Sequence, residues 1–183
     1  MIASLSIVSL LLLATGCTEV VANSERAAEH KAVLIDIQKQ AKDVGLQPGE
    51  IRKSCAMPFD CSANDFYEST GYIVDSTLTD QKMCTMFVAL AEQLNYTSSW
   101  RDLHLEESEP GKKVPDLYGG CVESLGTTLE PGNVGQSEGV VFVGKRQAKT
   151  STVNFWVQLQ SVLEPDGAPK GERGYYFLMS TFE

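Results

Sequence analysis

The chain has 183 residues, with 24 Asp and Glu against 15 Lys and Arg, and a net charge of −9 at pH 7. This acidic balance argues against nucleic-acid binding, which needs many phosphate contacts from Lys and Arg, and the sequence offers no polybasic run for anionic lipid. The length fits one folded domain, which we expect to span residues 24–183.

The first residues predict an export signal. Residues 2–16 carry no charge and are rich in Leu, Ile and Val, and Cys17 follows them directly. The run is shorter than the roughly 20 residues that cross a bilayer, so residues 1–16 are expected to be a signal peptide. Its end, Leu13-Ala14-Thr15-Gly16-Cys17, resembles the lipobox of bacterial lipoproteins. The resemblance implies a lipid on Cys17 that binds an exported cell-envelope protein to the membrane.

The chain departs from the usual lipoprotein pattern in two places. Ala14 stands where a larger apolar residue is common, and no basic residue precedes Arg26. A second small-residue processing site at residues 20–22, Val-Val-Ala, would instead release a soluble secreted protein. With Cys17 as the anchor, residues 17–23 form a short tether that keeps the domain close to the membrane.

Residues 24–44 predict an amphipathic helix. Apolar residues recur at helical spacing on one side: Ala27, Leu34, Ile37, Ala41 and Val44. Asn23 or Ser24 can cap the start of this helix, and Gly45 ends it. His30 lies close to the apolar stripe, and we interpret it as a packing residue rather than a ligand.

The next segment predicts a strand, a helix and a second strand. Residues 46–68 show no sustained periodicity, whereas residues 70–75 are rich in strand-forming side chains. Residues 77–80 carry a helix-start signature. The helix that follows has a wide apolar stripe: Met83, Cys84, Phe87, Val88, Leu90, Ala91 and Leu94. Residues 100–105 are expected to form the next strand.

Four cysteines remain once Cys17 is set aside: Cys55, Cys61, Cys84 and Cys121. An even number in an exported chain favours disulfides over free thiols. Of the three pairings we favour Cys55–Cys61, which closes a short loop, and Cys84–Cys121. A short helix over residues 116–125 would carry Cys121 toward the helix of Cys84. The spacings contain no C-x-x-C pair, so neither zinc nor another cofactor is expected.

The last third of the sequence predicts an antiparallel meander. Three β-rich runs, residues 140–143, 152–163 and 174–182, are separated by polar or Gly- and Pro-containing segments. Residues 129–139 carry turn formers and predict a loop. The expected fold class is therefore α+β, with two layers and the helices packed on one face of a mostly antiparallel sheet.

The catalytic motifs do not satisfy the chemistry they would need. Residues 135–139 match G-x-S-x-G, but a loop precedes Ser137, a strand is expected after it, and no histidine follows His104. Asp102, His104 and Glu106 would share one strand face, which we interpret as solvated. The same interpretation holds for the oxygen-bearing residues of a candidate calcium loop: Asp60, Asn64, Asp65 and Glu68.

Residues 153–160 give the one pointer to a binding surface. Their alternation sends four residues to the core, Val153, Phe155, Val157 and Leu159, and four to the other face, Asn154, Trp156, Gln158 and Gln160. A large aromatic ringed by amides suits recognition of a peptide, glycan or protein. The alternative is that a loop or helix covers Trp156. Aromatics on both faces of the last strand, residues 175–177, include a neighbour for it.

Three functions follow from these patterns. The first is a lipid-anchored envelope module that binds a partner protein, peptide or glycan, with Asn154, Trp156 and Gln158 as the binding residues. The second is a secreted hydrolase, for which two carboxylates converging in a cleft would be the sign. The third is an inhibitor of an envelope enzyme that uses the loop between Cys55 and Cys61.

Overall fold

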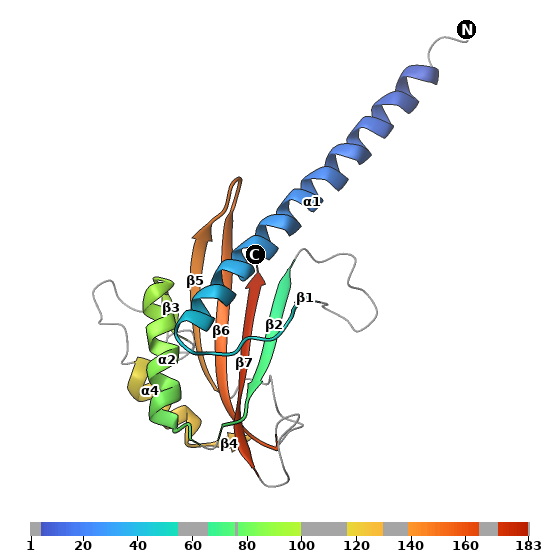
Figure 1. The fold of residues 1–183 in the computed structure, drawn as a ribbon. Helices are drawn as coiled ribbons and strands as arrows, with labels where there is room; N and C mark the ends of the chain where they lie inside the picture. Colours follow the sequence, from blue (N-terminus) through green and yellow to red (C-terminus); the bar gives the residue numbers. More distant parts are fainter. Residues whose placement is uncertain are drawn as a thin grey trace.

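The computed structural model describes residues 5–54, 66–75, 77–99, 117–129, 139–164 and 172–182. Figure 1 shows helices lying against one sheet, and the predicted α+β class is confirmed. The helices are α1 (Leu5–Asp43), α2 (Asp80–Gln93) and α4 (Leu117–Leu125). The strands are β1 (Ile51–Lys53), β2 (Tyr67–Ile73), β3 (Ser98–Ser99), β4 (Thr128–Leu129), β5 (Val140–Gln147), β6 (Thr152–Leu163) and β7 (Arg173–Phe182).

The described strands form one sheet in the order β1-β2-β7-β6-β5-β3. Each neighbouring pair along this order is antiparallel, and β4 adds a short parallel pairing to the end of β6. Strands β5, β6 and β7 are the C-terminal meander expected from the three β-rich runs. Because consecutive strands with short connections pair readily, this part of the topology follows from the sequence pattern.

All the described helices contribute to one hydrophobic core on one face of the sheet. The side chains of β6 that alternate toward this face, from Val153 to Leu159, are fully buried as predicted. Four phenylalanines fill the centre: Phe87, Phe142, Phe155 and Phe177. Phe87 of α2 lies 4.9 Å from Phe142 of β5, measured between ring centroids. Burial of a side chain of this size contributes about 1.5–3 kcal/mol, so these contacts between helix and sheet define the two-layer arrangement.

Helix α1 is longer than the sequence pattern predicted. Its last turns agree: His30, Leu34, Ile37 and Ala41 are buried, and Gly45 follows with φ +95°. The predicted start at residue 24 is wrong, because α1 begins at Leu5 and continues through Asn23, Ser24 and the expected tether. Leu and Ala favour helix, and no proline interrupts this stretch. Among the described residues, no helix is both long and apolar enough to span a bilayer.

The predicted helix near residue 80 is confirmed, and the strands around it are shifted. Thr79 caps α2, its hydroxyl accepting a hydrogen bond from the Lys82 N–H at 3.3 Å. Strand β2 covers residues 67–73 instead of 70–75, because Glu68 and Ser69 pair through their backbones despite polar side chains. Strand β1, in the segment expected to be irregular, was missed. Strand β3 ends at residue 99, and the strand expected over 100–105 lies outside the described residues.

The segment between α1 and β1 crosses β2 at very short distance. A side chain on Gly49 would collide with the Thr70 carbonyl, and one on Gly71 would collide with the Gln47 carbonyl. Ser69 donates a hydrogen bond to the Gly49 carbonyl at 2.8 Å, and Gln38 of α1 donates another at 2.6 Å. The two glycines therefore allow the backbone approach that fixes α1 against this edge of the sheet.

Candidate functional site

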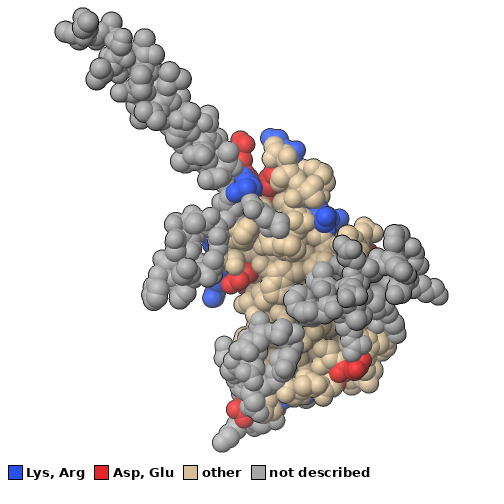
Figure 2. Space-filling model, turned by 180° about the vertical axis from the view of Figure 1, so that it is seen from behind, with Lys and Arg blue, Asp and Glu red and all other residues tan. Residues whose placement is uncertain are grey.

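The face of the sheet turned away from α1 changes in exposure along strand β6. Figure 2 views the molecule from this side. Asn154 and Trp156, near the β5–β6 turn, are partly exposed, whereas the next outward residues, Gln158 and Gln160, are only 3% and 1% exposed. The sequence placed all four on one polar face. The alternation is right, but the exposure expected for the two glutamines is wrong, because tertiary contacts and not the strand period decide what covers a face.

The accessible half of this face surrounds Trp156. Val143 and Ser180 lie opposite Trp156 on the two neighbouring strands, and Lys145 and Phe182 lie opposite Asn154. Five of these residues are partly or fully exposed and form what we call the Trp156 patch: Val143, Lys145, Asn154, Trp156 and Phe182. The patch combines two apolar side chains, one indole, one amide and one ammonium group on three paired strands. Such a mixture of aromatic and polar groups on a rigid support suits protein recognition.

Trp156 also packs against a small second core on the same face. Its buried members are Val162, Tyr176 and Leu178, with Tyr72 and Trp156 partly buried against them. The rings of Tyr72 and Tyr176 lie 5.3 Å apart. Burial, with smaller contributions from Tyr72 and Glu68, raises the pKa of Tyr176 to about 12. This cluster supports the Trp156 indole from one side, so the indole is held in place rather than projecting freely.

A groove of about 600 Å³ lies between α1 and the β5–β6 hairpin. One wall carries three carboxylates of α1, Glu25, Glu29 and Asp36, and the other carries Arg146 and Lys149. Asp36 forms an ion pair with Arg146 at 3.6 Å. The groove is therefore lined by opposite charges that already interact across it.

Glu29 joins α1 to the turn of the hairpin. Its carboxylate accepts hydrogen bonds from the Thr150 N–H at 2.6 Å, the Thr150 hydroxyl at 2.9 Å and the Ser151 hydroxyl at 2.6 Å. The Ser151 and Thr150 hydrogen bonds lower the pKa of Glu29 below its usual 4.5. A general acid needs a raised pKa. Glu29 therefore provides a structural contact and not the acid that the hydrolase hypothesis requires.

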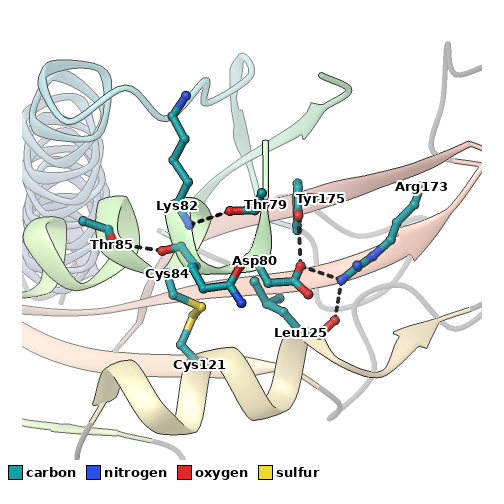
Figure 3. Close-up of a disulfide and its surroundings, with 10 residues drawn as sticks. Thr79, Asp80, Lys82, Cys84, Thr85, Cys121, Leu125, Arg173 and Tyr175 are labelled. Atoms are coloured by element: carbon teal, nitrogen blue, oxygen red, sulfur yellow. Dashed lines mark hydrogen bonds and ion pairs between the residues drawn. A yellow bond between two sulfur atoms is a disulfide. The ribbon is translucent and has the colours of Figure 1, made fainter. Parts of the chain in front are cut away.

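A polar network closes the opposite end of the sheet, close to the Cys84–Cys121 disulfide (Figure 3). Arg173 of β7 forms an ion pair with Asp80 at 2.6 Å and also donates to the Leu125 carbonyl and the Ser161 hydroxyl. The Tyr175 hydroxyl donates to the same Asp80 oxygen at 2.9 Å. The network thus connects the start of α2, the end of α4 and two central strands. Every partner belongs to the fold, so we assign it a structural role.

No family model matches the chain, and neither the curated proteins nor the solved structures include a significant match. The function must therefore be argued from the surfaces described above.

The remaining sequence-predicted site residues divide into two groups. Within the described part, Cys84 and Cys121 form the expected disulfide, with Cα atoms 5.7 Å apart, and His30 packs 5.4 Å from Phe66 as a buried side chain. The loop of Cys55 and Cys61, the strand of His104, the G-x-S-x-G serine and three of the calcium-loop residues lie outside the described residues. In the described ranges no group of His, Cys, Asp and Glu is arranged to hold a metal ion.

Two contacts of the site carried little or no sequence signal. The contact of Glu29 with Thr150 joins residues 121 positions apart, and that of Arg173 with Asp80 joins residues 93 apart. In the sequence, Glu29 is one of several charged residues on the polar face of a helix, and Arg173 is a charged residue at the start of a strand. Neither position is therefore marked as a long-range contact. The one local signal is the hydroxyl-rich turn at residues 150–152, whose hydroxyl groups can donate hydrogen bonds to a carboxylate.

Proposed function

We propose that the protein is a lipid-anchored envelope lipoprotein that works by binding a partner protein through the Trp156 patch. The patch itself is the observation that supports this function. Trp156 is partly exposed on the long strand β6 and is flanked on neighbouring strands by partly exposed Val143 and Phe182. Tryptophan is enriched among the residues that dominate binding energy, especially where a rigid neighbour holds its ring.

The proposed lipid anchor at Cys17 rests on the lipobox-like sequence, and the course of α1 describes how such an anchor would be joined to the domain. The helix runs without interruption from Leu5 into the domain, where Leu34 and Ile37 are part of the core. A lipid on Cys17 would thus be joined to the domain through helical backbone rather than a loose tether. The patch would then lie close to the membrane, at the end of the domain near the β5–β6 turn.

Site-specific photocrosslinking in the intact envelope tests the binding surface. A photoreactive residue in place of Asn154 is expected to capture one discrete partner, and adding Trp156→Ala should reduce that capture by about tenfold or more, as for a central aromatic contact. Ile35 is 50% exposed on α1, so the same residue in place of Ile35 is the matched control, expected to capture nothing. Capture that is independent of Trp156 would show that the patch is not the binding surface.

The anchor has its own test. Mass spectrometry of the mature N-terminus is expected to show acylated Cys17, and Cys17→Ala should prevent membrane association. An unmodified N-terminus at or after Ala22 would replace the anchored form with a secreted one.

A further inference from the structure

The structure gathers positive charge at the end of the domain nearest Cys17, although the chain as a whole is acidic. Two segments meet there, residues 24–31 of α1 and residues 145–151 of the hairpin, which the Glu29 hydrogen bonds hold together. They contain five cations: Arg26, Lys31, Lys145, Arg146 and Lys149. Glu25 and Glu29 lie in the same segments, Asp36 pairs with Arg146 at 3.6 Å, and Glu19 lies nearer to Cys17, so the cations exceed the acids by one. The acidic excess that gives the net charge of −9 therefore lies elsewhere in the chain.

We infer that this basic end contacts anionic phospholipid headgroups of the membrane that holds the anchor. The inference rests on the proposed lipid at Cys17. Figure 1 shows α1 projecting from the end of the domain that also carries the β5–β6 turn, and in Figure 2 blue atoms gather around the base of that helix with red atoms among them. Sequence pattern could not predict this end as a lipid-binding surface, because its cations come from segments more than 110 residues apart.

The length of helix between Cys17 and the basic end fits this contact. At 1.5 Å per residue, Arg26 lies about 13 Å along α1 from Cys17, and Glu29, which holds the hairpin turn, about 18 Å. The polar headgroup layer is about 5–7 Å thick. With Cys17 at its inner boundary, Arg26 lies within roughly one Debye length of about 8 Å from the headgroups. A tilt of the helix toward the hairpin brings Lys149 into the same range.

The exposed lysines of the hairpin are suited to this contact and can be changed without disturbing the core; Lys145 also belongs to the Trp156 patch, so the test is made on vesicles that hold no partner protein. Lys145 and Lys149 are both exposed, whereas Arg146 is partly buried by its ion pair with Asp36. A cation near an anionic membrane surface strengthens association by roughly fivefold. Loss of both lysines should therefore weaken the contact by about 25-fold.

The test uses the wild-type protein isolated from bacterial membranes and reconstituted into vesicles of phosphatidylcholine, alone or mixed with phosphatidylglycerol. Energy transfer from Trp100 and Trp156 to dansyl headgroups reports how closely the domain approaches the bilayer. The variant is Lys145→Glu with Lys149→Glu. The matched control is Lys39→Glu with Lys42→Glu, two exposed lysines near the far end of α1.

At low salt, the wild type and the control are expected to transfer more energy in the anionic vesicles than in the neutral ones. The hairpin variant should lose that increase, and high salt should remove it from all three. Equal transfer in both lipid mixtures, or an unchanged hairpin variant, would overturn the inference. Retention of the protein on neutral vesicles tests the lipid anchor separately, because these vesicles carry no anionic headgroups. If the protein is not retained there, the anchor fails, and sedimentation with anionic vesicles decides the inference: the hairpin variant must then bind at least about 25-fold more weakly than the control, because each Lys→Glu change removes a cation and adds an anion.

Discussion

Among the described residues, the disulfide between Cys84 and Cys121 should be the largest single contribution to stability that one pair of side chains makes. It joins α2 to α4 and closes a loop over a sequence separation of 37. In the loop-entropy treatment, a loop of about 38 residues stabilises the folded chain by roughly 3.9 kcal/mol. Both cysteines are fully buried, so replacing both with Ala also removes burial worth about 0.8 kcal/mol per sulfur. The expected loss is about 4–5.5 kcal/mol.

Urea unfolding of the Cys84→Ala/Cys121→Ala variant measures this loss. With a slope of about 2 kcal/mol per molar urea, the midpoint should fall by roughly 2 M or more. The matched comparison repeats both titrations under reducing conditions, where wild type and variant lack the crosslink and should differ only by the small burial contribution. A loss below about 1 kcal/mol under oxidising conditions would refute the reasoning, because it would mean that apolar contacts alone hold α4 on α2.

Three further predictions concern Glu29, Tyr175 and the glycines. Because the folded pKa of Glu29 is lowered, its contribution is present above pH 4.5 and is lost as the pH falls through the folded value; the stability of Glu29→Gln should therefore vary less than that of wild type in acid, measured by thermal unfolding. Burial and the Asp80 hydrogen bond raise the pKa of Tyr175 to about 12, so Tyr175→Phe should remove one late-titrating phenol from the ultraviolet titration, and an unchanged curve near pH 12 would contradict the assignment. Gly144→Ala should destabilise by about 1–3 kcal/mol, because the new methyl group meets the buried Phe155 ring, whereas Gly120→Ala, with open space around it in α4, should stabilise by about 0.5–1 kcal/mol; calorimetry of the two variants compares them directly.

The features that the sequence predicted correctly are those that repeat locally. The alternation from Val153 to Leu159 identified one face of β6 as core, and the stripe of α2 identified Met83, Phe87 and Leu90 as buried. Both periods are properties of the backbone and survive any tertiary context. The Cys84–Cys121 pairing was also predicted, since the helix expected over residues 116–125 would carry Cys121 toward α2.

The failures occur where distant parts of the chain decide the outcome. Gln158 and Gln160 follow the same alternation as Trp156, yet they are buried because of what lies over the sheet, which strand period does not encode. Strand β1 is three residues long, too short for an alternation to be recognised. The start of α1 was misplaced because a capping pattern at Asn23 competes with helix-forming residues on both sides, and propensity prevailed.

The polar contacts of the candidate site could not be predicted for a related reason. Glu29, Arg146 and Arg173 are ordinary charged residues in the sequence, and their partners are chosen by the packing of α1 and the strands. The Trp156 patch was anticipated in part: Asn154 and Trp156 are accessible, Gln158 is not, and Val143 and Phe182 were added by strand pairing. The pairing register of β5 and β7 with β6 places Val143 and Phe182 on the same face as Trp156, and this forms the patch.

The shortness of the border strands has a consequence for crowding. The described sheet is bordered by β1, of three residues, and β3, of two, whereas its interior strands reach 12 residues. A long open border would offer unpaired N–H and C=O groups to an identical neighbour. If the proposed lipid on Cys17 confines the molecules to a membrane, they meet one another far more often than molecules in bulk solution. The border strands themselves offer such a neighbour little backbone, but β1 pairs with only three residues of β2 and β3 with only two of β5, so a second molecule would have to pair with the parts of β2 and β5 that extend beyond them.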